Sequence, residues 1–148
     1  MLYFFLDRQA RPERENAIMA QVLLFNIRGD KLRKIRMLLF KLGLRCVVVA
    51  PEDFSRTLGA LCGRAEDAPA VRADEAPAFE GEMLVMDGLS PVQFHGLLDA
   101  LRRERAAVAL KAVVTESNAR WSAARLYCEL SAEHEVMEKL KGKSIHRT

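Results

Sequence analysis

The chain has 148 residues, enough for one domain with a single core of ordinary size. Half of the residues are hydrophobic and 29% are charged, which excludes a disordered chain and is typical of a soluble globular protein. The formal net charge of +3 is too small to indicate a dedicated nucleic-acid binder by itself. No stretch approaches the roughly 18 consecutive apolar residues of a membrane span, and the apolar N-terminus is too short for a secretory signal. We therefore expect a cytoplasmic protein.

The sequence has no recognisable catalytic, metal-binding or cofactor-binding motif. The three cysteines are far apart and form no C-x-x-C pair, so we expect reduced thiols among apolar residues and no metal site. The histidines show no spacing to cysteine or aspartate that supports a nucleophilic triad. The isolated glycines form neither G-x-G-x-x-G nor a phosphate loop. We accordingly predict no cofactor, and no residue is identified as catalytic by a motif.

Residues 1–18 differ from the rest of the chain, because charged residues surround Pro12 without a helical or strand period. We expect this extension to be disordered or non-native. Met19 leads straight into the first apolar run, so we hypothesise that it is the physiological start. Residues 19–140 are expected to form one α/β domain, and residues 141–148 a basic tail.

The first half of this domain predicts a βαβ unit. The apolar residues 21–27 indicate a strand buried on both faces. Asp30 is expected to cap a helix. The inner stripe of that helix repeats every 3.6 residues and consists of Leu32, Ile35, Leu38, Leu39 and Leu42. Residues 45–51 are a second, β-branched strand, and Asp53 is expected to open a shorter helix.

The second half begins after residues 64–82, whose alanines, prolines and acids predict a mobile surface loop. Residues 83–88 and 110–115 indicate two further strands. Between them, Ser90 is expected to cap a helix that has Pro at its first position. Ser122 is expected to cap the last helix. The predicted inner face of that helix consists of Leu126, Leu130, Met137 and Leu140.

The two halves repeat the order strand, helix, strand, which suggests an internal duplication. In this alignment Asn26 is equivalent to Asp87, and Ala50 to Thr115. The alternation of elements favours an α/β fold of two βαβ repeats, with a mostly parallel four-stranded sheet and flanking helices. A ferredoxin-like α+β sandwich of two split βαβ units fits the same order and stays open.

Polar residues occur where the predicted strands end and helices begin. In open α/β sheets ligands bind there, because helix N-termini present amide donors and partial positive charge. If the sheet is parallel, one edge gathers a candidate ligand site made of Asn26, Asp87, Thr115, Glu116, Asn118 and Trp121. Helix caps and turns require the same residue types. A structural turn, in which Asn118 bonds the backbone and Trp121 fills core, therefore stays open.

Three functions are compatible with this pattern. The first is a non-enzymatic binding or regulatory module in which Thr115 and Asn118 hydrogen-bond a small polar ligand that Trp121 covers. The second is a small enzyme with Asp87 or Glu116 as general base. The third is an interaction surface for an acidic protein or RNA on the first helix, formed by Lys31, Arg33, Lys34 and Arg36. RNA is less favoured than protein, because the sequence indicates no exposed aromatic residues for base stacking.

The densest motif of the chain is K-A-V-x-T-x-x-N-x-x-W, which stands at Lys111, Ala112, Val113, Thr115, Asn118 and Trp121. Together with VLLFNI, LVMDGLS and LYCELSAEHE, it resembles the small bacterial proteins grouped as domain of unknown function 3783. The resemblance extends over residues 21–138. It implies a bacterial cytoplasmic protein of this architecture, and it implies no activity. The N-terminal extension falls outside the pattern, and the acidic loop is longer than the family leads us to expect.

Overall fold

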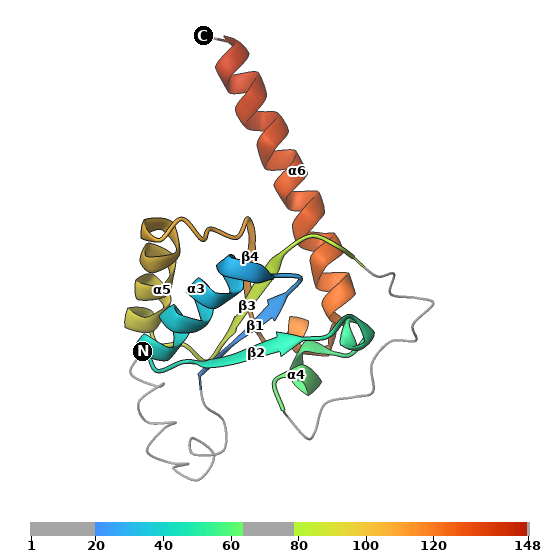
Figure 1. Ribbon diagram of the computed structural model, residues 1–148. Coiled ribbons are helices and arrows are strands. Elements are labelled where there is room, and N and C mark those ends of the chain that lie inside the picture. The colour runs from blue at the N-terminus through green and yellow to red at the C-terminus, as the bar shows by residue number, and fades with distance from the viewer. Residues whose placement is uncertain (1–19, 64–78, 148) are drawn as a thin grey trace.

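The computed structural model describes residues 20–63 and 79–147. The expected start at Met19, the extension 1–18 and most of the loop 64–82 lie outside these residues. Four strands form one sheet in the order β2-β1-β3-β4 (Figure 1). Their bounds are β1 (Gln21–Phe25), β2 (Arg45–Val49), β3 (Met83–Asp87) and β4 (Leu110–Val113).

The sheet consists of two parallel pairs joined antiparallel at its centre. β1 is parallel to β2, and β3 is parallel to β4, while β1 and β3 run in opposite directions with Leu23 opposite Val85. The predicted α/β fold with a mostly parallel four-stranded sheet is therefore confirmed. The ferredoxin-like alternative is wrong, because a split βαβ unit separates its two parallel strands, whereas here they are neighbours.

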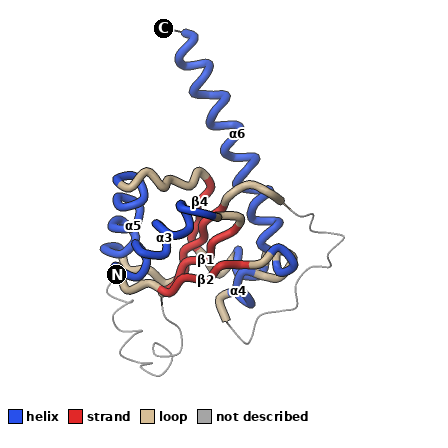
Figure 2. Tube along the Cα trace, in the orientation of Figure 1, coloured by secondary structure: helices blue, strands red, loops and turns tan. Residues whose placement is uncertain are grey.

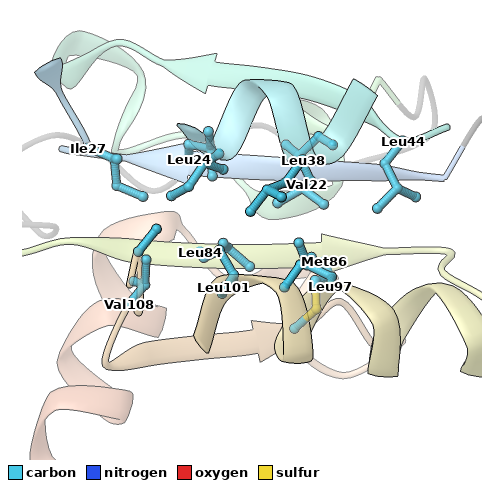
Figure 3. Close-up of a cluster of buried hydrophobic side chains, with 14 residues drawn as sticks. Val22, Leu24, Ile27, Leu38, Leu44, Leu84, Met86, Leu97, Leu101 and Val108 are labelled. Atoms are coloured by element: carbon cyan, nitrogen blue, oxygen red, sulfur yellow. The ribbon is translucent and has the colours of Figure 1, made fainter. Parts of the chain in front are cut away.

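Helices cover both faces of the sheet (Figures 1 and 2). Helices α3 (Gly29–Lys41) and α5 (Pro91–Arg103) lie on one face, and α4 (Leu58–Leu61) and the start of α6 (Ala123–Arg147) lie on the other. Because side chains alternate along a strand, the central strands contribute to both cores. The core under α3 and α5 takes its strand residues from Val22, Leu24, Leu84 and Met86 (Figure 3). The opposite core takes Leu23, Phe25, Met83 and Val85.

The segments that follow the two outer strands meet across the second face. Each makes a short 3-10 turn, η1 (Pro51–Asp53) or η3 (Asn118–Arg120), before its helix begins. Thr57 and Ser122 then form an isolated antiparallel bridge. The Leu58 amide donates to the Trp121 carbonyl at 2.9 Å, which ties the two halves together.

The helix starts were predicted with mixed success. Ser90 caps α5 in a capping box with Gln93, and the Ser122 hydroxyl accepts from an amide in the first turn of α6, so both predictions are confirmed. The prediction for Asp30 is wrong, because α3 begins at Gly29, which makes Asp30 its second residue. The cap position is Arg28, which supplies no side-chain hydrogen bond. The prediction for Asp53 is also wrong, because that residue ends a 3-10 turn and Thr57 caps α4.

Helix α6 is longer than the surface available to it. Leu126 is buried and Leu130 is partly buried against the sheet. Met137 and Leu140 are 55% and 54% exposed, so their predicted inward placement is wrong. The physical reason is that the helix continues past the end of the sheet (Figure 1). It also runs through most of the stretch expected to be a basic tail, to residue 147.

Candidate functional site

The six residues predicted to form a ligand site do not converge. Because β1 and β3 are antiparallel, their carboxyl ends lie at opposite edges of the sheet, and Gln21 rather than Asn26 lies beside Asp87. Asn26 belongs to the edge at which β3 begins. Asp87 and the segment after β4 share the other edge. The prediction of one shared edge is wrong, since it required a parallel centre.

Asn26 has a structural role at its own edge. Its backbone is left-handed (φ 63°), a conformation that asparagine tolerates better than most residues. Its amide nitrogen donates to the carbonyls of Phe79 and Gly81, both at 3.0 Å, and so holds the chain that enters β3. At the end of β3 the residue with matching conformation is Gly88 (φ 77°). The counterpart of Asn26 in the second half is therefore Gly88, one residue after the Asp87 that the sequence alignment predicted.

Phe79 was placed in a surface loop by the sequence analysis, but its side chain is 9% exposed. Its ring stacks between Phe54 and Tyr127, with centroids 4.3 and 4.2 Å away. A Cβ atom on Gly81 would collide with the Tyr127 hydroxyl, so any larger residue at this position would require the Tyr127 ring to move. Together with Asn26, these contacts fix the entry to β3.

Asp87 lies in the interior, with 1% of its surface exposed. It accepts a hydrogen bond from the Gln21 amide at 3.1 Å, and the same amide donates to the carbonyl of Cys62 at 3.0 Å. These bonds connect β1, the end of β3 and the end of α4. A general base must reach the proton that it removes, and the Asp87 carboxylate is enclosed by its own chain.

The turn between β4 and α6 is closed by its own hydrogen bonds. The Asn118 carbonyl oxygen accepts from the Thr115 amide at 2.8 Å, and its amide nitrogen donates to the Val113 carbonyl at 3.0 Å. The Thr115 hydroxyl accepts from the Asn118 amide at 3.1 Å. Trp121 is half-buried, and the Arg125 guanidinium lies 4.1 Å from its ring centre, a cation–π distance. Glu116 is exposed. This pattern matches the structural turn that the sequence left open.

The four residues predicted to form a basic surface on α3 separate into two pairs. Lys31 forms an ion pair with Glu82 at 2.5 Å, and the Lys34 ammonium donates to the Glu104 carbonyl at 3.1 Å, so both tie α3 to the second half. Arg33 and Arg36 lie on the exposed side of the helix.

Arg36 also lies close to Cys46 on β2. Burial raises the pKa of the Cys46 thiol, and the charge of Arg36 and its hydrogen bond to the thiol act in the opposite direction. The thiolate form is therefore disfavoured at neutral pH.

Sequence reasoning missed two exposed apolar residues on α3. Met37 is 56% exposed and Phe40 is 81% exposed. Their exposure could have been predicted from the sequence, because both residues fall outside the helical stripe that contains the buried Ile35, Leu38 and Leu39. The expectation that no aromatic residue is exposed is therefore wrong.

A groove of about 200 Å³ lies between the start of β4 and α6, at residues Ala109, Leu110, Lys111, Leu130, Glu133, His134 and Met137. A hollow of about 120 Å³ lies on the other side of Lys111, beside α5. The Lys111 ammonium donates to the Val108 carbonyl at 2.6 Å. Burial lowers the pKa of Lys111, and the charge of Arg102 lowers it further. None of the six predicted ligand residues lines either space.

Within residues 20–63 and 79–147, no group of three or more His, Cys, Asp or Glu side chains is placed to hold a metal ion. The same part of the chain contains no helix that is long and apolar enough to cross a membrane. All three cysteines are free thiols.

These features define a small α/β fold of two βαβ units around a mixed sheet, with exposed apolar residues on α3 and α6. Residues 82–137 match the profile of a family described as a domain of unknown function (DUF3783). The family resemblance is thus confirmed from the start of β3 to the exposed part of α6. No curated protein and no solved structure matches the chain significantly.

Proposed function

We propose that the protein is a non-enzymatic interaction module that binds an acidic protein partner through the outer face of α3. The observation that carries this proposal is the exposure of Phe40, 81%, with Met37 one helical turn before it. Arg33 and Arg36 flank the two apolar side chains on the same helix. We refer to these four residues as the α3 patch.

The second half of the fold provides an internal reference for the α3 patch. Helices α3 and α5 both have 13 residues and pack against the same core. At the positions of α5 that correspond to Met37 and Phe40 stand Asp99 and Arg102, which form an exposed ion pair at 3.5 Å. At these two positions of α5, the solvent-facing residues are therefore polar. Solvent exposure alone therefore does not explain why α3 has the apolar residues Met37 and Phe40 at the corresponding positions.

The composition of the α3 patch is that of a protein interface. Aromatic residues, Met and Arg are enriched at such interfaces, and fully burying a Phe or Met side chain stabilises an association by about 1.5–3 kcal/mol. On β2, the edge strand beside β1, Val48 is also 45% exposed. Strand alternation places Val48 on the same face as Cys46, which packs against the core under α3.

Charge selects an acidic partner. The exposed charged residues of this region include Arg33, Arg36, Lys41 and Arg45, and Asp30 forms an ion pair with Arg33 at 2.7 Å. The charge that remains on this side of α3 is positive. Positive charge on an interface steers partners of opposite sign and rejects basic ones. RNA is a weaker fit, because single-stranded binding uses successive aromatic platforms and the patch has one ring. The polar-ligand and general-base hypotheses have less support, because Asn26, Asp87 and Asn118 bond their own chain.

The test is a photocrosslinking experiment in cells. A photoreactive phenylalanine analogue is incorporated at position 40, and in a parallel strain at position 92. Val92 is 82% exposed on α5 and provides a matched control for exposure. We expect a defined protein adduct from position 40 and none from position 92. The double variant Arg33→Glu, Arg36→Glu is expected to abolish the adduct.

The controls separate the alternatives. Mass spectrometry of the adduct is expected to identify an acidic protein. An adduct that is sensitive to ribonuclease would assign the α3 patch to RNA instead. Equal adducts from positions 40 and 92, or an adduct that survives the charge reversal, would refute the proposal.

A further inference from the structure

The distal half of α6 extends beyond the sheet (Figure 1). The helix has 25 residues and is about 37 Å long. Every residue from 132 to 141 is exposed, and the helix projects away from the sheet (Figure 1). The distal half is about as long as the isolated helices, of roughly 12–15 residues, that are only marginally stable in water. A partner that covers the segment would stabilise it.

The projecting segment carries an apolar stripe. Val136, Met137 and Leu140 are 56%, 55% and 54% exposed. Leu130 stands one heptad before Met137, and Leu140 follows it by three residues, so these side chains share one face of the helix. The stripe begins on the body of the protein, where Leu130 packs against the core.

The charges along the same segment change sign once. From residue 126 to residue 138 the chain has no Lys or Arg, and its acids are Glu129, Glu133, Glu135 and Glu138. From Lys139 to the end of the chain there is no acid, and the charged residues are basic. The change of sign falls between Met137 and Leu140, in the middle of the apolar stripe.

We propose that α6 pairs antiparallel with α6 of a second copy of this chain, centred between Glu138 and Lys139. In this arrangement Met137 of each copy packs against Leu140 of the other. Each acidic segment then lies beside a basic segment. A parallel pair would place acid beside acid and base beside base, which is unfavourable. Charge patterns of this kind set helix orientation in coiled coils.

The groove beside β4 supports the same occupant. Glu133 and His134 line it together with Leu110, Leu130 and Met137. In the antiparallel pair the basic end of the second helix reaches this level of the first. The groove is largely apolar, and its charged lining residues are Glu133 on α6 and Lys111 on β4, whose ammonium donates to the Val108 carbonyl. The α6 side of the groove thus offers apolar contact and one acid to the basic end of a second helix. This surface is separate from the α3 patch, and the inference does not depend on the proposed function.

Disulfide trapping in the full-length protein tests the orientation. Leu140→Cys and Glu133→Cys are made separately with Cys128→Ser, which removes the exposed native thiol. The two positions are one heptad apart and so share a helix face. In the antiparallel pair, the two copies of position 140 are about 4–5 Å apart along the axis, and those of position 133 about 16 Å. We expect rapid crosslinking from Leu140→Cys and none from Glu133→Cys.

Equal crosslinking at both positions would indicate a parallel pair, and no crosslinking at either would indicate a monomer; either result overturns the proposal. Sedimentation equilibrium gives an independent readout. The unmodified protein is expected to change from monomer to dimer as its concentration rises. Met137→Glu with Leu140→Glu is expected to remain monomeric, with an unchanged melting temperature at concentrations where the unmodified protein is also a monomer. Val92→Glu, at an exposed site of α5, is expected to dimerise normally. Dimers that persist in the double Glu variant would also refute the pairing.

Discussion

In the first half of the fold, the helix that follows the outer strand, α4, is four residues long, whereas its counterpart α6 has 25. Thr57 and Ser122 cap the two helices in the same way, because each hydroxyl accepts a hydrogen bond from a backbone amide in the first turn. The same two residues form the bridge between the halves. The beginnings of these helices are therefore alike, and their ends differ. The shared part positions the chain on the sheet, and the additional turns of α6 extend beyond it.

Helices α3 and α5 show the same division. Both end in a left-handed residue, Gly43 or Arg105, and in the same backbone bond, from Leu44 to Leu39 in one and from Ala106 to Leu101 in the other. Their solvent faces differ in the last two turns, where α3 exposes Met37 and Phe40 and α5 carries the ion pair of Asp99 and Arg102. Features common to both halves hold the fold together. Features found in one half, namely the α3 patch and the projecting part of α6, are where partners are proposed.

The largest expected effect tests whether the two halves unfold as one unit. Leu24 is fully buried in the core that α3 and α5 share. Leu24→Ala leaves a cavity there and is expected to lower the free energy of unfolding by about 2–5 kcal/mol. Urea denaturation followed by far-UV circular dichroism and by Trp121 fluorescence should give coincident curves. Because Leu24 lies in the first half and Trp121 in the second, separate transitions would show that the halves unfold independently.

The next effect compares the two 3-10 turns. Asn118 makes two side-chain hydrogen bonds to the backbone, whereas Asp53, at the corresponding place after β2, makes none among the described residues. Asn118→Ala is expected to lower the free energy of unfolding by about 1–2 kcal/mol. Asp53→Ala is expected to change it by less than about 0.5 kcal/mol. Similar losses in urea denaturation for both variants would show that the turns are held by something other than the Asn118 amide.

The sequence was sufficient to predict the strands, the α3 and α5 stripes and the α/β class, because these depend on local periodicity. It did not predict that β1 and β3 are antiparallel. Strand direction at the centre of the sheet depends on how the chain returns from α4 to β3, and no short-range pattern encodes this return. The candidate ligand site depended on that direction, so Asn26 and Asp87 were assigned to one edge and lie at opposite edges.

The errors on single residues have a related cause. Periodicity shows which side of a helix is apolar but not where the surface that it packs against ends, so Met137 was assigned to the core. Residue type does not separate a cap residue from an acid within the first turn, as with Arg28 and Asp30. Phe40 could have been recognised from its position outside the helical stripe. The hydrogen-bond partners of Asn26, two carbonyls more than fifty residues away, were not accessible to sequence reasoning.

A third prediction uses the difference between the helix starts. Ser90 caps α5 with its side chain, whereas Arg28 at the start of α3 provides no such bond. Ser90→Ala is expected to lower the free energy of unfolding by about 1 kcal/mol. Arg28→Ser should raise it by a smaller amount, about 0.5 kcal/mol, since Arg28 already has the extended backbone of a cap residue. A destabilised Arg28→Ser variant in thermal and urea denaturation would show that Arg28 has a role besides its place at the cap.

The smallest expected effect concerns the left-handed residues that end α3 and α5. Gly43 (φ 73°) adopts this conformation without steric cost, whereas the Cβ atom of Arg105 (φ 56°) meets the following carbonyl. Arg105→Gly is expected to raise the free energy of unfolding by about 0.5–1 kcal/mol, and Gly43→Ala to lower it by about 1 kcal/mol. A Cβ atom at Gly43 would have nothing within 4 Å, so its cost is conformational rather than steric crowding by neighbours. Opposite shifts in urea denaturation would show that the two helix ends are governed by the same backbone constraint. A destabilised Arg105→Gly variant would mean instead that the Arg105 side chain contributes more to the native state than its backbone strain costs.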